Sequence, residues 1–307
     1  MSAKTKSLAL SVLGFTGLAW AVACSSSNNS TSTTTASSST STGTSGTSNK
    51  SSTSSNSSTS GTGTGSVTAP TLVDDAANPS GQISFPVTSG YTAGYWFTTI
   101  NDGGSITPVP AASGGSWSYT PVPSPADASI AQAACISGVT SPTEYSEAGE
   151  GFNWALQQID AAADSGIQAP AVEWDISKYT GISFWVYVPA DSGAGTQSIR
   201  VLFPDKTTDP RGNVCLLDAS TPATTCYDSW EKTVPFAPGW QLVQIHFTDL
   251  IQLGFGEPDT YMSGGVPAFD AQHSFGVTFQ ANGPQMADAS AGIPFDFCIA
   301  DLYLTTN

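Results

Sequence analysis

The chain has 307 residues, of which 39% are hydrophobic and 10% are charged, and its 24 acidic residues outnumber its 8 basic ones. The formal net charge of -16 argues against a nucleic-acid partner, because phosphate binding requires a basic surface. Gly, Pro, Ser and Thr are abundant, which excludes coiled coils and long helical arrays. Composition therefore excludes these classes of protein but does not indicate a function.

Residues 1–23 have the features of an export signal. Two early lysines precede an apolar run, Leu8 to Val22, that is short for a membrane-spanning helix. The run ends in Ala-Val-Ala-Cys at 21–24, which resembles the lipobox of bacterial lipoproteins. This resemblance implies that Cys24 is acylated and anchors the mature chain at the bacterial outer membrane or cell surface. The alternative is an ordinary cleavage site beside an unrelated cysteine.

Residues 24–66, which begin at that cysteine, consist almost entirely of Ser, Thr and Gly. After Cys24 no apolar side chain larger than Ala is present, so nothing offsets the entropy of ordering the segment. We expect a disordered tether that holds a folded domain away from a lipid surface. The remaining residues, 67–307, are long enough for one large β domain.

The folded region is expected to be all β. Its short apolar runs have a period of two and are bounded by Gly, Pro, Asp and Asn, a pattern typical of strands. Only the stretch 155–163 tolerates a helix, and it is short. Many short strands separated by turns indicate a single jelly-roll β-sandwich. The predicted strands are 95–100, 181–188, 198–203, 240–247, 275–279 and 295–304.

Four cysteines lie in the folded region, and an even number in an exported protein favours disulfides. Cys215 and Cys226 are separated by only 10 residues of a Pro-, Asp- and Thr-rich loop, so they form the preferred pair. That choice leaves Cys135 with Cys298. Metal binding is the alternative, but the folded region has no C-x-x-C spacing and only two histidines.

Five short segments of the folded region occur in an order that is typical of one family. They are Leu-Val-Asp-Asp at 72–75, Gly-Tyr-Trp-Phe at 94–97 with Asn-Asp-Gly at 101–103, Trp-Asp-Ile-Ser-Lys-Tyr-Thr-Gly-Ile-Ser-Phe-Trp at 174–185, and Phe-Asp-Phe-Cys-Ile-Ala-Asp-Leu at 295–302. Together they resemble galactose-binding-like jelly rolls, particularly the carbohydrate-binding modules of the family 11 type found on bacterial lipoproteins. The resemblance covers about residues 71–304 and implies a β-sandwich that binds sugar on one sheet face.

The resemblance also implies a structural calcium ion. Asp74, Asp75 and Asp301 lie at the two chain ends that this fold brings together, and Ca²⁺ needs several oxygens in one place. The last strand departs from the family pattern twice, because Cys298 replaces a Trp and Ala300 replaces an Asp. The first departure fits the long disulfide, and the second removes one calcium ligand. If the site forms, added calcium raises the melting temperature.

The folded region contains no recognisable catalytic constellation. Glu173-Trp174-Asp175 begins like the paired-acid strand of jelly-roll glycosidases, but Ser177 stands where the second carboxylate belongs. Retaining hydrolysis needs two carboxyl groups, and one acid cannot perform both roles. The G-x-S-x-G pattern of serine hydrolases is absent from this part of the sequence. We expect a protein that is not an enzyme, with a hydrolase of unrecognised type as the alternative.

The parity of side chains along the predicted strands gives a candidate glycan site. On 181–188 the aliphatic residues share one face, so Trp185 and Tyr187 point the other way. Aromatic faces combined with planar polar groups are the mixture that binds sugars. The same sorting turns further polar residues outward from three other strands: Arg200, Gln244, His246 and Gln280.

The sequence thus predicts a non-catalytic, lipid-anchored carbohydrate-binding module displayed on the cell envelope. Its expected partners are a polysaccharide or other glycan and a membrane reached through the lipid anchor only, with no nucleic acid. The alternative is a structural or protein-interaction lipoprotein whose outward aromatic side chains are covered by loops, which leaves no open sugar site. Fold resemblance does not decide between them, because one scaffold hosts many kinds of site.

Overall fold

The computed structural model describes residues 69–101, 103–109, 117–122, 132–143, 146–158, 170–190, 198–215, 225–256, 261–285 and 290–306. All of them belong to one compact unit, Gly63–Asn307. The expected signal peptide at 1–23, the acylation site Cys24 and the tether at 24–66 lie outside the described residues. Within the described ranges, no helix is long and apolar enough to cross a membrane.

The regular structure of the described residues is almost entirely β, with short 3₁₀ turns between some strands. The 3₁₀ turns are η2 (Pro210–Gly212), η3 (Phe247–Asp249) and η4 (Ala271–His273). The strands are β1 (Thr71–Asp74), β2 (Tyr91–Ala93), β3 (Trp96–Ile100), β4 (Ser105–Thr107), β5 (Thr120–Pro121), β6 (Gln132–Val139), β7 (Glu147–Asn153), β8 (Ala155–Gln157), β9 (Ala171–Val172), β10 (Gly181–Val188), β11 (Ser198–Phe203), β12 (Trp230–Pro235), β13 (Gly239–His246), β14 (Met262–Ser263), β15 (Val266–Pro267), β16 (Gly276–Asn282) and β17 (Pro294–Thr305).

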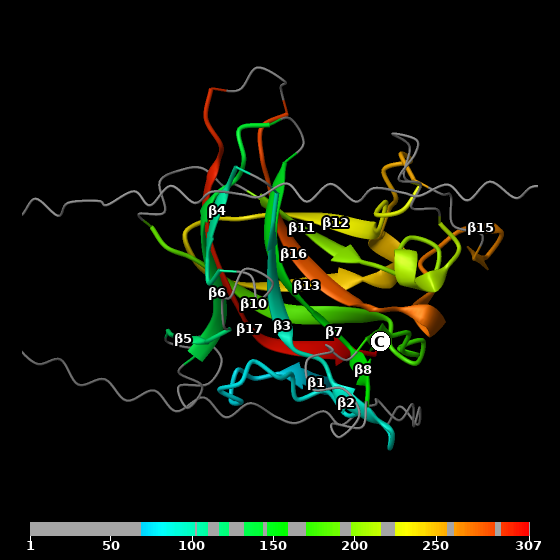
Figure 1. Ribbon diagram of the computed structural model, residues 1–307. Coiled ribbons are helices and arrows are strands. Elements are labelled where there is room, and N and C mark those ends of the chain that lie inside the picture. Colours follow the sequence, from blue (N-terminus) through cyan, green and yellow to red (C-terminus); the bar gives the residue numbers. More distant parts are fainter. Residues whose placement is uncertain are drawn as a thin grey trace, which may run out of the picture. The chain divides into compact units, whose positions relative to one another are not determined.

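Two sheets contain most of the described strands (Figure 1). The seven-stranded sheet has the order β13-β10-β17-β6-β4, with β1 paired to β17 and β5 paired to β6. The five-stranded sheet has the order β12-β11-β16-β7-β3. Neighbouring strands in both sheets are antiparallel. The described residues therefore form the predicted all-β jelly-roll sandwich.

The core lies between these two sheets. Each strand directs every second side chain into it. On β10, Ile182, Phe184 and Val186 are fully buried and alternate with partly exposed residues. Phe184 meets Phe279 of β16 edge-on, with ring centroids 5.0 Å apart. The apolar faces of the two sheets therefore contact each other, and their opposite faces point outward.

The six strands predicted from the sequence are present as β3, β10, β11, β13, β16 and β17. Their ends agree within one residue, except that β16 continues three residues further, to Asn282. The helix-tolerant stretch at 155–163 instead begins as strand β8, which pairs with β2 on one side and β9 on the other. This pairing overrides the local preference, and residues 159–163 of the stretch lie outside the described ranges.

Both expected disulfides are present. Cys135 of β6 and Cys298 of β17 lie directly opposite each other in adjacent strands and are bonded. Cys215 and Cys226 close the loop that precedes β12. The long bridge therefore joins two adjacent strands of the seven-stranded sheet, whereas the short bridge joins the segment after η2 to the segment that leads into β12.

Candidate functional site

A groove of about 830 Å³ crosses the outward face of the five-stranded sheet. Its lining side chains alternate along the strands with core residues, so the same parity that builds the core also builds the groove. All five strands contribute: Phe97 and Thr99 from β3, Glu147 and Asn153 from β7, Arg200 and Leu202 from β11, Glu231 from β12, and Thr278 and Gln280 from β16.

Two glycines keep the middle of this face free of side chains. Gly149 and Gly151 of β7 lie in register with Gln280 and Thr278 of β16, respectively. A Cβ atom at Gly149 or Gly151 would approach a carbonyl oxygen of β16 to 2.6 or 2.5 Å. Any larger residue would therefore push the two strands apart, and glycine preserves both the pairing and the open space.

A series of polar side chains runs across the groove. Arg200 donates two hydrogen bonds to the carboxylate of Glu231, one from Nε at 2.6 Å and one from a terminal guanidinium nitrogen. On the next strands, Gln280 forms a hydrogen bond with Glu147. Burial raises the pKa of Glu147, while the bond from Gln280 and the positive charge of Arg200 oppose that rise. The groove thus carries both charged and neutral hydrogen-bonding groups.

The second arginine of the chain lies in the same groove. Arg211 donates to the carboxylate of Asp209 through Nε at 2.7 Å and a terminal nitrogen at 2.6 Å. Its other terminal nitrogen donates to Oδ1 of Asn153 at 2.9 Å, and its guanidinium carbon lies 4.6 Å from the ring centroid of Phe275. Each arginine is therefore held by an acid, which leaves planar donors without an excess of positive charge.

Aromatic side chains border these polar groups. Tyr227 and Phe255 line the groove from two loops, with 56% and 58% of their surfaces exposed. Phe97 lines it from β3 at the other side of the sheet. Exposed aromatic rings suit the C–H faces of sugars, and planar amide, guanidinium and carboxylate groups suit their hydroxyls. This is the chemistry that the groove offers.

The six residues predicted to bind carbohydrate lie on two different faces. Arg200 and Gln280 line the groove on the five-stranded sheet. The other four belong to β10 and β13 of the seven-stranded sheet and point away from the core on its opposite side: Trp185, Tyr187, Gln244 and His246. Side-chain parity gives the direction of a residue relative to its own sheet, but it does not tell which sheet a strand joins.

The outward face of the seven-stranded sheet has its own aromatic cluster. Tyr187 lies opposite Trp240 in the β10–β13 pair, with ring centroids 5.0 Å apart, and both pack against the buried cluster of Ala133, Cys298 and Ala300. Trp185 is half-buried and lies opposite Leu242, which is 53% exposed. Gln244 and His246 are exposed at the edge strand of this sheet. Sugar binding by this face stays a prediction.

The groove also contains functional candidates that sequence analysis missed. Glu231 and Glu147 lie on strands that were not predicted, and Tyr227 and Phe255 lie in loops, where parity has no meaning. One signal was available for Tyr227, because it directly follows a cysteine of the short disulfide. Loop residues that are fixed by a rigid scaffold are frequent binding residues.

The three acids predicted to bind calcium have different surroundings. Asp74 and Asp301 are buried near each other, since Asp74 pairs with Leu302, whereas Asp75 is partly exposed. Oδ2 of Asp74 accepts hydrogen bonds from Trp96 Nε1 at 2.7 Å and from the Tyr119 hydroxyl at 3.0 Å. Both donors bind the same carboxylate oxygen of Asp74. In the described part of the chain, no three His, Cys, Asp or Glu residues are arranged to hold a metal ion, and calcium binding stays a prediction.

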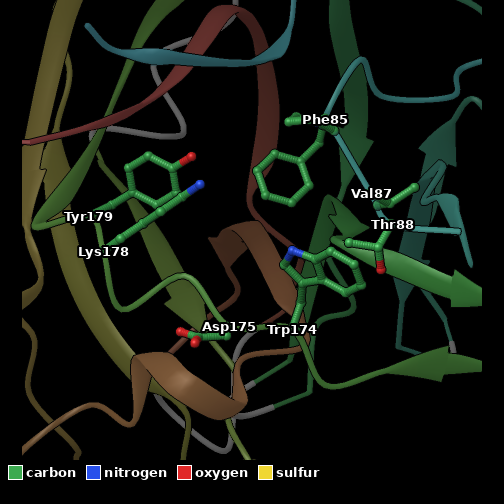
Figure 2. Close-up of a pocket in the computed structure, with 8 residues that line it drawn as sticks. Phe85, Val87, Thr88, Trp174, Asp175, Lys178 and Tyr179 are labelled. Atoms are coloured by element: carbon green, nitrogen blue, oxygen red, sulfur yellow. The ribbon is translucent and has the colours of Figure 1, made fainter. Parts of the chain in front are cut away.

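A second, smaller pocket of about 470 Å³ surrounds Trp174 and Asp175, the residues that begin like a glycosidase strand. Figure 2 shows the Phe85 ring between Tyr179 and Trp174, with Lys178 alongside Tyr179. The Lys178 ammonium lies 4.9 Å from the Tyr179 ring centroid. Hydrogen bonds from the side chain and backbone of Ser177 lower the pKa of Asp175. Asp175 is thus stabilised as a carboxylate by the residue that replaces the second catalytic acid.

No protein-family model and no curated protein matches the chain. Solved structures are similar to it at low identity. The family 11 carbohydrate-binding module of the cellulosomal cellulase Lic26A-Cel5E of Clostridium thermocellum is 14% identical, over 79% of this chain and 97% of that chain, with a TM-score of 0.41.

Another solved structure is a family 11 module from Clostridium thermocellum in complex with a β-1,3-1,4-mixed-linked tetrasaccharide, at 13% identity over 77% of this chain and 95% of that chain, with a TM-score of 0.36. An exo-β-agarase is 10% identical over 78% of this chain and 25% of that chain, with a TM-score of 0.36.

Proposed function

We propose that this protein is a non-catalytic carbohydrate-binding module that binds a glycan chain along the groove on the five-stranded sheet. The observation that carries the proposal is the composition of that groove. It joins exposed aromatic side chains to a row of planar hydrogen-bonding groups, and glycines leave room between them. A groove that is open along a sheet suits an extended saccharide better than a compact metabolite.

The charges of the groove favour a neutral glycan. Arg200 and Arg211 are each paired with a carboxylate, and Glu147 adds a further acid beside them. An acidic polysaccharide would meet no unpaired arginine among the described groove residues and would face an acidic protein. The salt bridge between Arg200 and Glu231 also argues for binding rather than catalysis, because the Glu231 carboxylate is already paired with the guanidinium group.

The first prediction is that the chain binds at least one neutral polysaccharide. In native gels containing mixed-linked β-1,3-1,4-glucan, xyloglucan, glucomannan or galactan, at least one polymer should retard the protein. Polygalacturonate, an acidic polymer, should not. Mixed-linked glucan is included because one of the similar solved structures is a complex with a mixed-linked tetrasaccharide.

A protein that migrates unchanged in all four neutral polymers would contradict the proposed function. In that case the interaction-lipoprotein alternative becomes the better account, because it needs no open sugar site. Retardation by polygalacturonate alone would contradict the neutral-ligand part of the proposal.

We also propose that the chain is exported and anchored through the acylated Cys24, which would display the groove on the bacterial outer membrane or cell surface. The lipobox-like sequence at 21–24 supports this proposal. The second prediction is that Cys24→Ser abolishes acyl labelling and moves the protein from the membrane to the soluble fraction. A variant that fractionates with membranes as the parent does would contradict the anchor.

A further inference from the structure

Tyr227 has an unusual backbone conformation. Its φ is 75°, in the left-handed region where a bulky side chain is strained. The same residue is 56% exposed and lines the groove. A large aromatic side chain that sits on a strained backbone and is open to solvent contributes little to the stability of the fold. Such backbone strain is typical of functional positions.

The neighbouring residue explains what holds this conformation. Asp228 is buried, at 2% exposure, and its carboxylate accepts backbone hydrogen bonds from Leu253, Gly254 and Gly256 at 3.0, 2.8 and 3.2 Å. A single carboxylate thus ties the loop at 253–256 to the chain next to Tyr227. Bonds from N–H groups to an ionised acceptor are stronger than those between neutral groups.

Two further contacts fix the segment on its other side. The Tyr227 N–H donates to the carbonyl oxygen of Thr208 at 2.8 Å, and Cys226 is bonded to Cys215. Close packing adds to these bonds, because a Cβ atom at Gly256 would lie 2.5 Å from Cβ of Asp228. The loop around Tyr227 is therefore pre-organised before any ligand arrives.

The loop that Asp228 ties down carries its own exposed apolar side chains. Phe255 is 58% exposed and Leu253 is 54% exposed, and both line the same groove as Tyr227. The polar groups of Ser229, Thr208 and Asp209 line the groove beside them. The apolar side chains are thus bordered by hydrogen-bonding groups rather than by an extended apolar surface, which suits a sugar ring better than a protein partner.

We propose that Tyr227 and Phe255 form an aromatic subsite beside β12, that Asp228 is its positioning residue, and that this subsite binds one pyranose ring of the glycan. This inference rests on the proposed function of the groove. It adds that a rigid pair of loops outside the sheet, rather than the sheet itself, supplies a large part of the affinity. Pre-organisation lowers the entropy that binding would otherwise lose.

The test compares variants of the full chain on the neutral polysaccharide of the panel that retards the parent most. Tyr227→Gly should weaken retention about tenfold or more, as truncation of a buried aromatic contact does. Its melting temperature should equal or exceed that of the parent, because glycine adopts a positive φ without strain. Tyr227→Phe should bind like the parent, since it keeps the ring.

A matched control and a length series separate a subsite from a structural role. Tyr95 is 40% exposed and is not among the residues that line the groove, so Tyr95→Ala should leave binding unchanged. With oligosaccharides of increasing length, calorimetry should show that Tyr227→Gly, Phe255→Ala and Asp228→Asn all lose the affinity gained by the longer ligands. Loss of one subsite has this signature, whereas partial unfolding lowers only the fraction of active protein.

Each result supports or overturns the inference. A parent that binds while Tyr227→Gly binds equally well overturns the subsite and leaves the proposed function intact. Asp228→Asn with a lower melting temperature but parental affinity per folded molecule overturns the positioning role. A parent that no neutral polysaccharide retards overturns the proposed function and the subsite with it.

Discussion

Replacing Glu150 by Gln is expected to stabilise the domain at neutral and alkaline pH, by roughly 3 kcal/mol near pH 8. Glu150 lies on β7 with the core-facing parity of Ala148 and Phe152 and is fully buried. Neither of its carboxyl oxygens has a hydrogen-bond partner among the described residues. Burial therefore raises its pKa well above the ordinary value, and the neutral amide avoids the cost of a buried charge.

The pH dependence follows from the direction of that change. A carboxyl group whose pKa is raised by folding stabilises the native state while it is protonated, below the pKa of the unfolded chain. This contribution is lost as the pH rises through the pKa of the folded state. Parent and Glu150→Gln should therefore have equal stability near pH 4 and diverge at higher pH. Urea unfolding across this range measures the difference.

Two features of the chain sharpen this experiment. Burial also raises the pKa of Asp74, to about 6. The stability of Glu150→Gln should therefore still decline as the pH rises, but by less than the stability of the parent. Glu173→Gln is the control, because its side chain is 34% exposed and its replacement should change stability little. A Glu150→Gln variant with the same pH profile as the parent would show that Glu150 finds a partner that the described residues do not provide.

Removal of the long disulfide is the second large effect. The bridge between Cys135 and Cys298 spans 163 positions in the sequence. Loss of such a cross-link increases the entropy of the unfolded chain, and the loop-closure relation gives a cost of about 5 kcal/mol for the double replacement by Ala. The free energy of unfolding under oxidising conditions is the measured quantity.

The short bridge provides the comparison. Cys215 and Cys226 are 11 positions apart, and the same relation gives about 3 kcal/mol for their double replacement. The short-bridge variant should also weaken glycan binding, because this bridge holds Cys226, the residue before Tyr227, whereas the long-bridge variant should bind normally while folded. Equal losses of stability in the two variants would show that the entropy of the unfolded chain does not depend on loop length as the loop-closure relation assumes.

The strands that could be predicted are those whose apolar residues alternate and are β-branched or aromatic. β10 and β11 were predicted with their observed ends, Gly181–Val188 and Ser198–Phe203. β7 was not predicted, because Glu-Ala-Gly-Glu-Gly-Phe-Asn contains residues that are uncommon in strands. Its place between β16 and β3 is decided by tertiary pairing rather than by local preference.

The site was less predictable than the fold. The outward direction of Arg200 and Gln280 follows from alternation, and the structure places both at the groove. The sequence could not separate them from Trp185, because the choice of sheet depends on contacts between strands far apart in the chain. For Tyr227 the one sequence signal, its place after a disulfide cysteine, does not show that the side chain is exposed, because the turn at this position is held by the neighbouring Asp228 carboxylate.

Strand β17 bears on the order in which the domain can assemble. Its first half pairs with β6 and its second half with β1, while β10 runs along its other edge (Figure 1). It is therefore the common neighbour of three strands that precede it by long stretches of chain. The edges of β1, β6 and β10 that pair with β17 stay open until β17 has been synthesised and joins the sheet. Sheet completion is thus a late, long-range event, and folds dominated by such pairings reach the native state slowly.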